Sequence, residues 1–132
     1  MQHINVWAVL VAGMSSMLLG AVWYSPLLFA SIWMRESGMT EAKSKSANVA
    51  KVMGTAFALS LIGAAVFAMF LGPTADLAFG AAAGFSAGLC WIAGSFGINY
   101  LFEQRSWKLF LVNGGYHTVQ YTLIGSVLGM WH

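Results

Sequence analysis

The sequence predicts an all-α fold, an antiparallel bundle of four transmembrane helices with the N-terminus and the C-terminus both on the outer side. Two observations carry this prediction. The 132 residues are 59% hydrophobic and only 8% charged, whereas a soluble domain needs roughly 25% charged residues to keep its surface wetted. In addition, all six Lys and Arg residues flank two of the three predicted loops.

Chain length sets the number of spans. A spanning helix needs about 20 apolar residues, so four helices and short loops account for the whole sequence. We therefore expect a single integral membrane domain over residues 1–132, without a separate soluble domain. The predicted helices cover about residues 4–34, 47–71, 77–102 and 108–131.

The first predicted helix contains a proline. Pro26 removes one backbone hydrogen bond, which neighbouring helices make tolerable inside a membrane. We therefore expect one helix that kinks at Pro26 and continues into the interface up to residue 34. Gly38 is expected to end it, and Thr40 is suited to be the N-cap of a short helical lead-in to the second helix.

The later boundaries come from turn signals. Gly72 and Pro73 form a strong turn after the second helix. Because only a few residues separate the second helix from the third, these two are expected to form a tight antiparallel hairpin. A short polar loop over residues 103–107 leads to the fourth helix.

Orientation follows from the positions of the cations, since cytoplasmic loops carry an excess of Lys and Arg. The first loop and the third loop have all of them, namely Arg35, Lys43, Lys45, Lys51, Arg105 and Lys108. These two loops are therefore predicted to be cytoplasmic. Met1, the Gly72–Pro73 turn and His132 are predicted to face outward.

Small residues recur at four-residue steps and predict close helix packing. Gly80, Gly84 and Gly88 fall on one face of the third helix. The other helices offer small residues as well, among them Gly20, Gly54, Gly125 and Gly129. These faces could pack inside the bundle, or the Gly80 face could pair with a second protomer. Because there are more such faces than one bundle needs, we expect a homo-oligomer.

Polar side chains inside a bilayer are costly, so each is a candidate functional residue. In the fourth helix Asn113, His117 and Gln120 follow at steps of four and three, which places them on one helix face. Further polar residues reach a similar cytoplasmic depth from the first and third helices, namely Tyr24, Ser25, Asn99 and Tyr100. The sequence thus predicts that three helices direct polar groups to one layer.

Two interpretations of this layer stay open. In the first, Asn99, Asn113 and His117 form a buried hydrogen-bond network that fixes helix register. In the second, His117 lines a hydrated cavity and titrates, because the unperturbed pKa of histidine is about 6.5. Proton relay, cation coordination or substrate binding would then follow.

Several functions are disfavoured by the sequence. A metal site is not expected, since His3 and His132 lie at the outer face, His117 lies across the membrane midplane, and Cys90 stands alone. We expect no enzyme, because no acidic residue inside a helix pairs with a base. The net charge of +2 gives no basis for nucleic-acid binding.

Three motifs in order resemble a known family. WYSP at residues 23–26, INYLFE at 98–103 and KLFLVNGGYH at 108–117 are similar to motifs of a family of small bacterial membrane proteins catalogued as domain of unknown function 1761. The resemblance implies a multi-pass protein of the bacterial inner (cytoplasmic) membrane, and it carries over no known activity and no cofactor. The matching positions are Trp23, Tyr24, Ser25, Pro26, Asn99, Tyr100, Asn113, Gly114, Tyr116 and His117.

Three functions remain as hypotheses. The first is a homo-oligomeric channel- or transporter-like subunit, with candidate binding or pore-lining residues His117, Asn113, Asn99, Gln120, Tyr24, Ser25 and Tyr116. The second is an accessory subunit that packs against a larger membrane complex through its small-residue and aromatic faces. The third, a membrane enzyme, has the least support. In each case the lipid bilayer is the first partner.

Overall fold

The computed structural model describes residues 4–131, all of whose regular structure is helical, and no strand occurs in this range. The all-α prediction is therefore confirmed for it, while Met1, His3 and His132 lie outside the described residues. The elements are α1 (Val6–Trp23), α2 (Ala30–Ser37), α3 (Glu41–Ser46), α4 (Val49–Leu71), α5 (Leu77–Ser86), the π-helix η1 (Ala87–Ala93), α6 (Gly94–Glu103) and α7 (Trp107–Met130).

Three helices are long and apolar enough to cross a membrane. They are α1, α4 and the continuous run of α5, η1 and α6 over Leu77–Glu103. The 24 residues of α7 are long enough, but Asn113, His117 and Gln120 reduce its apolar character. Three of the four predicted spans are therefore supported over residues 4–131, while a fourth span at α7 stays a prediction.

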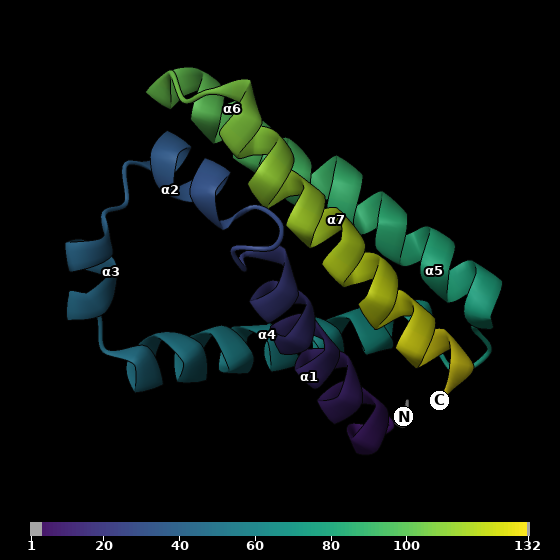
Figure 1. Cartoon of the computed structure of the whole chain (residues 1–132). Helices are drawn as coiled ribbons and strands as arrows, with labels where there is room; N and C mark the ends of the chain where they lie inside the picture. Colours follow the sequence, from purple (N-terminus) through teal and green to yellow (C-terminus); the bar gives the residue numbers. More distant parts are fainter. Residues whose placement is uncertain (1–3, 132) are drawn as a thin grey trace.

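The centre of the fold is α7, which explains its polarity. It contacts α1, α2, α4, α5, η1 and α6, and Figure 1 shows it lying between α5 on one side and α1 on the other. Because α7 faces other helices, its polar groups can bond to protein rather than face lipid.

The predicted hairpin of the second and third helices is wrong. The antiparallel partner of α5 is α7, whereas α4 runs across this pair instead of along it (Figure 1). The reason is the glycine face of α5 and η1. A Cβ atom added at Gly80 would overlap the carbonyl oxygen of Gly125, and one at Gly84 would overlap that of Tyr121. Side chains there would separate the two backbones, so glycine permits the contact.

The remaining predicted packing glycines differ in their surroundings. A Cβ at Gly88 would lie 2.7 Å from the His117 carbonyl oxygen, and one at Gly129 would overlap that of Asp76. Gly20 lies against the Tyr116 ring, while nothing lies within 4 Å of a Cβ at Gly54. The Gly80 face is thus filled by α7 of the same chain, which leaves no room there for a helix of a second protomer.

The first predicted helix, 4–34, is two helices. α1 ends at Trp23, a turn follows, and α2 begins at Ala30. Pro26 has no N–H to donate to the Val22 carbonyl, and its ring disfavours the preceding helical turn. That carbonyl instead accepts from Ser25, from the hydroxyl at 2.6 Å and from the backbone N–H at 3.2 Å. The chain therefore changes direction where only a kink is predicted.

Local signals elsewhere are confirmed. Thr40 caps α3 by accepting from the Lys43 N–H at 3.1 Å. Gly38 and Gly72 follow the ends of α2 and α4 with φ of 78° and 81°, a left-handed region that favours glycine. Asp76 and Ser106 cap α5 and α7 in the same way as Thr40, although the sequence analysis did not single them out.

The buried core lies where α1, α4 and α7 cross. Its fully buried members include Ala8, Ala12, Ala64 and Ile124. Ala64 is the one buried residue of α4 in the described chain, so most of α4 presents apolar side chains outward. Figure 1 shows α3 and the first half of α4 standing away from α1 and α7. The four-helix bundle is therefore less compact than predicted.

We expect Gly84→Ala to lower the free energy of unfolding by roughly 1–3 kcal/mol, the usual cost of overpacking. Its methyl group would meet the backbone of Tyr121 and Thr122, which cannot rotate away. Reversible unfolding in mixed micelles, followed by circular dichroism, measures the change.

The matched control is Gly54→Ala, which adds the same methyl group where nothing lies within 4 Å. It should leave stability unchanged or raise it by up to about 1 kcal/mol. Equal destabilisation by both substitutions would contradict the proposed α5–α7 contact.

Candidate functional site

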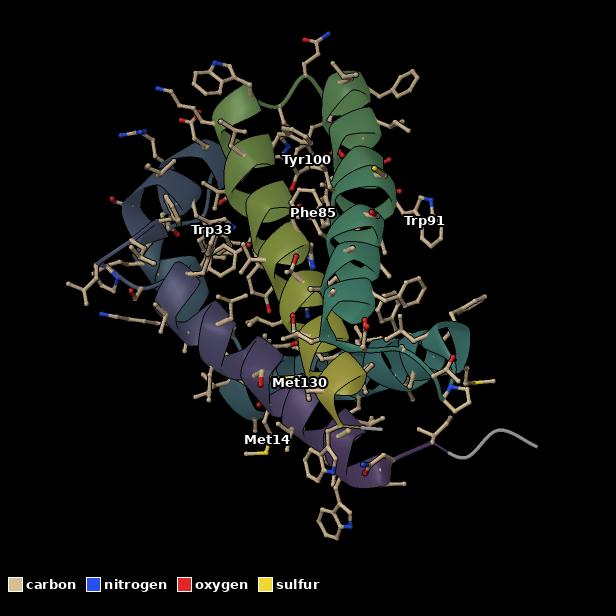
Figure 2. The ribbon with its side chains drawn as sticks, turned by 90° about the vertical axis from the view of Figure 1, so that its right-hand side faces the viewer. Met14, Trp33, Phe85, Trp91, Tyr100 and Met130 are labelled. Atoms are coloured by element: carbon tan, nitrogen blue, oxygen red, sulfur yellow. The ribbon has the colours of Figure 1, made fainter. Side chains whose placement is uncertain are left out.

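A hydrogen-bonded layer joins α1, α6 and α7. The Tyr24 hydroxyl donates to Asn113 Oδ1 at 2.6 Å, and Asn113 Nδ2 donates to the Tyr100 hydroxyl oxygen at 2.7 Å. Tyr24 follows the last residue of α1, and Tyr100 belongs to α6. Figure 2 shows Tyr100 between the ribbons of α6 and α7. The predicted convergence of three helices thus exists, with Asn113 at its centre.

Two further hydrogen bonds tie α1 to α7. Trp23 Nε1 donates to the Val112 carbonyl at 2.9 Å, and the Tyr116 hydroxyl donates to the Ser16 carbonyl at 3.0 Å. Trp23 was not among the predicted site residues. Its depth within an apolar helix, too far from either interface for a belt residue, is the signal that could have identified it.

His117 lies in a stack of rings beside this layer. Its ring is parallel to that of Phe96, with centroids 5.2 Å apart and an angle of 13°, and Tyr116 meets it edge-on. Nδ1 lies 2.7 Å from Gln120 Oε1. Because an amide oxygen only accepts, Nδ1 carries a proton in this pair. The structure therefore places two of the predicted residues, His117 and Gln120, in direct contact.

Two predicted residues do not join the layer. The Ser25 hydroxyl bonds to the Val22 carbonyl, so it serves the end of α1. Asn99 lies on the exposed side of α6, and its side chain has no hydrogen bond within residues 4–131. The neighbouring Tyr100 takes the place predicted for Asn99, since adjacent residues of a helix point about 100° apart.

The polar groups of the layer satisfy one another. Over residues 4–131, no buried side-chain nitrogen or oxygen lacks a hydrogen-bond partner. This geometry fits the interpretation of a hydrogen-bond network. A hydrated cavity at His117 stays a hypothesis, and the two clefts described below are lined by other residues of the described chain.

The larger of these clefts borders the layer. It has a volume of about 630 Å³ and lies between α1, α2, α3 and the first half of α4. Two rings of the polar layer form part of its wall, and the wall includes Met17, Tyr24, Trp33, Met34, Met53 and Tyr116. Trp33 meets Tyr24 edge-on at 5.9 Å, and Figure 2 labels it beside α2. We call this space the α1–α4 cleft.

The chemistry of the α1–α4 cleft is specific. Its wall is apolar and rich in methionine and aromatic rings, and no charged side chain of the described chain lines it. The Tyr24 and Tyr116 hydroxyls already donate their protons to Asn113 and to the Ser16 carbonyl. Their oxygens therefore remain as acceptors. Such a cleft fits a neutral apolar molecule that donates a hydrogen bond.

Charged residues of the first and third polar loops lie close together. Arg105 Nη1 donates to the Ser37 carbonyl at 3.3 Å, which joins the loop after α6 to the end of α2. A hydrogen bond from Ser106 lowers the pKa of the partly buried Glu36 carboxyl, and the charges of Arg35 and Lys108 lower it further. The first and third polar loops thus meet at the same end.

The Tyr24–Asn113 hydrogen bond can be measured by a double-mutant cycle. We expect Tyr24→Phe and Asn113→Leu to couple by about 0.6 kcal/mol, the average for hydrogen bonds between membrane helices. The free energy of unfolding in mixed micelles is the readout. The control pair is Tyr24→Phe with Asn99→Leu. Their effects on the free energy of unfolding should be additive, because Asn99 lies outside the layer. Additive losses for Tyr24 and Asn113 would argue against the bond.

Comparison with known proteins identifies a family. No curated protein and no solved structure matches the chain. The model of one family, described as "Protein of unknown function (DUF1761)", matches residues 7–129. This range contains the three motifs at residues 23–26, 98–103 and 108–117, together with the hydrogen-bonded layer that they form. The chain therefore belongs to the DUF1761 family, as the order of those motifs indicates.

Proposed function

We propose that this protein is a four-span membrane protein that acts as a channel- or transporter-like subunit and binds a small amphipathic molecule in the α1–α4 cleft. α7 is the fourth span, and both termini lie outside. The clustering of Arg35, Arg105 and Lys108 around Glu36 supports this orientation. Cations concentrate on the cytoplasmic side of small membrane proteins. The turn between α4 and α5 and the end of α7 meet at the opposite end, where Gly129 touches Asp76.

The proposed orientation predicts the labelling of single cysteines. In a Cys90→Ser background, Thr74→Cys should react with a membrane-impermeant maleimide in intact cells. Lys43→Cys should react only after the membrane is permeabilised. Both positions are exposed, so burial would not explain a failure to react. Labelling of Lys43→Cys in intact cells would show that the first loop faces outward.

The α1–α4 cleft carries the proposal for binding. Its volume of about 630 Å³ lies within the range of small-molecule sites, which are mostly apolar with a few placed polar groups. Here the polar side chains of the wall are Ser44, Tyr24 and Tyr116, and the two tyrosine hydroxyls are held by hydrogen bonds to α7 and α1. A bound molecule would place its apolar body against Met17, Trp33 and Met53. Its hydrogen-bond donor would face the tyrosine oxygens.

Glycine keeps the cleft open. A Cβ at Gly20 would lie 3.4 Å from the Tyr116 hydroxyl oxygen, an ordinary contact, so this position tolerates a side chain. Since Gly20 lines the cleft, a larger side chain there would occupy the space of a ligand. Gly20→Leu therefore blocks the site with little direct damage to the fold.

Binding can be tested with dansylamide, a fluorophore with an apolar ring system and a sulfonamide N–H donor. We expect the full chain in micelles to bind dansylamide with a blue shift of its emission, and Gly20→Leu to weaken binding by at least about tenfold, or 1.4 kcal/mol. Gly54→Leu is the matched control, because Gly54 faces open space outside the cleft. Equal binding by wild type and Gly20→Leu would reject the cleft as the site. Equal loss in the control would show that the effect of Gly20→Leu is not specific to the cleft, and would reject it as well.

One observation favours a second candidate, an accessory subunit. Most of α4 is exposed, including Val49, Leu59, Ile62 and Phe70, and Gly54 has no neighbour. This apolar face could lie against lipid, against copies of the chain or against another membrane protein. Native mass spectrometry of the protein from mild extraction distinguishes the cases. A defined homo-oligomer supports the transporter-like role, whereas a stoichiometric complex with other chains supports the accessory role.

A further inference from the structure

A second cleft lies between α6 and the beginning of α7. Its volume is about 450 Å³. One part of its wall is apolar and includes Gly94, Gly97, Ile98 and Phe110, whereas the other part carries polar and charged groups. A cleft with an apolar wall and a polar mouth is complementary to an amphipathic ligand. We call this space the α6–α7 cleft.

The apolar wall of the α6–α7 cleft is smooth because two glycines contribute to it. A Cβ at Gly94 would have no atom nearer than 3.9 Å, so open space lies in front of this backbone. Gly97 faces the Phe110 ring, and a Cβ atom added at Gly97 would lie 3.1 Å from that ring. Ile98 and Leu101, which are strongly exposed, extend the apolar surface toward the lipid. This wall suits an alkyl chain that lies along α6.

The polar mouth offers mainly hydrogen-bond donors. Arg105 has five N–H groups, of which one reaches the Ser37 carbonyl and another faces Glu103 at 3.6 Å. The Tyr100 hydroxyl accepts from Asn113, and no acceptor for its own proton occurs within residues 4–131. Trp107 is 67% exposed at the same mouth, as expected for an aromatic residue at a membrane interface.

The charge balance at the mouth favours an anion. Arg105 lines the cleft, Glu103 lies beside Arg105, and Lys108 directly follows Trp107 in α7. Glu36, which pairs with Arg35, accepts a hydrogen bond from Ser106 of the same wall. Three cations therefore stand against two carboxylates. A guanidinium suits a phosphate because it binds oxygen pairs in a bidentate manner.

We propose that the α6–α7 cleft binds a phospholipid with an anionic headgroup. The phosphate and the headgroup contact Arg105, Tyr100 and Trp107, and one acyl chain lies against Gly94, Gly97 and Phe110. The site shares no lining residue with the α1–α4 cleft. It is therefore independent of the function proposed above, and either could fail alone.

Native mass spectrometry of the delipidated full chain tests this site, with phosphatidylglycerol and phosphatidylcholine of identical acyl chains as probes. We expect the first bound phosphatidylglycerol to be preferred over phosphatidylcholine by about fivefold or more, the effect of one cation near a membrane surface. Arg105→Gln should abolish this preference. Arg105→Lys should retain most of it, which separates charge from a structural effect of losing the bond to Ser37.

Two further variants decide between this cleft and a general attraction of charges. Gly94→Leu places a side chain in the space beside the apolar wall without meeting protein atoms. It should weaken the binding of both lipids several-fold, although the charge of the protein is unchanged. Lys43→Gln removes one exposed cation from α3, and should have no effect. Glycerol phosphate, a headgroup without chains, should not compete. A loss with Lys43→Gln equal to that with Arg105→Gln, full binding by Gly94→Leu, or competition by glycerol phosphate would overturn the proposal.

Discussion

The rest of the structure depends on the backbone contact between the glycine face of α5 and η1 and the face of α7. Gly80 and Gly84 bring their helix so close to α7 that added Cβ atoms would overlap the carbonyls of Gly125 and Tyr121. Because α7 is held there on one side and meets α1 and α2 on the other, it becomes the inner helix. An inner helix can carry Asn113, His117 and Gln120, which would be costly on a surface that faces lipid. The least apolar of the long helices is thus the one that the others cover.

The position of α7 in turn determines where a ligand could bind. Tyr24 and Trp23 reach α7 from the end of α1, and Pro26 breaks the chain directly after them. The chain then turns into α2, and α3 and the beginning of α4 follow at a distance from α1. The α1–α4 cleft is the space that this route encloses, with Tyr24 and Tyr116 on its inner wall. A single helix that only kinked at Pro26 and continued to residue 34, as the sequence analysis predicted, would not enclose it.

What could be predicted from the sequence was set by local chemistry. The ends of helices at Gly38 and Gly72, the cap at Thr40 and the shared depth of Tyr24, Tyr100 and Asn113 follow from residue type and spacing alone. The pairing of helices does not, because several helices carry small residues and only the assembled chain shows that α7, not α4, fits the face of Gly80. The same limit explains why Asn99 was wrongly predicted to join the layer. Its depth in the membrane matches that of Tyr100, but the rotation of α6 about its axis turns Asn99 outward. The π-helix at Ala87–Ala93 adds to this uncertainty of rotation, because its wider turn shifts the faces of all later residues.

Asn113 gives the two clefts opposite chemical character. Its amide accepts at Oδ1 from Tyr24 and donates at Nδ2 to Tyr100, so the two tyrosines take different roles. The Tyr24 hydroxyl donates its hydrogen bond to Asn113, so its oxygen remains an acceptor beside the α1–α4 cleft. The Tyr100 hydroxyl oxygen accepts a hydrogen bond from Asn113, so its own O–H remains a donor beside the α6–α7 cleft. One side chain on the central helix therefore sets an accepting wall on one side and a donating wall on the other. This amide thus favours a hydrogen-bond donor in the α1–α4 cleft, and it adds the Tyr100 donor to the Arg105 guanidinium that favours a phosphate in the α6–α7 cleft.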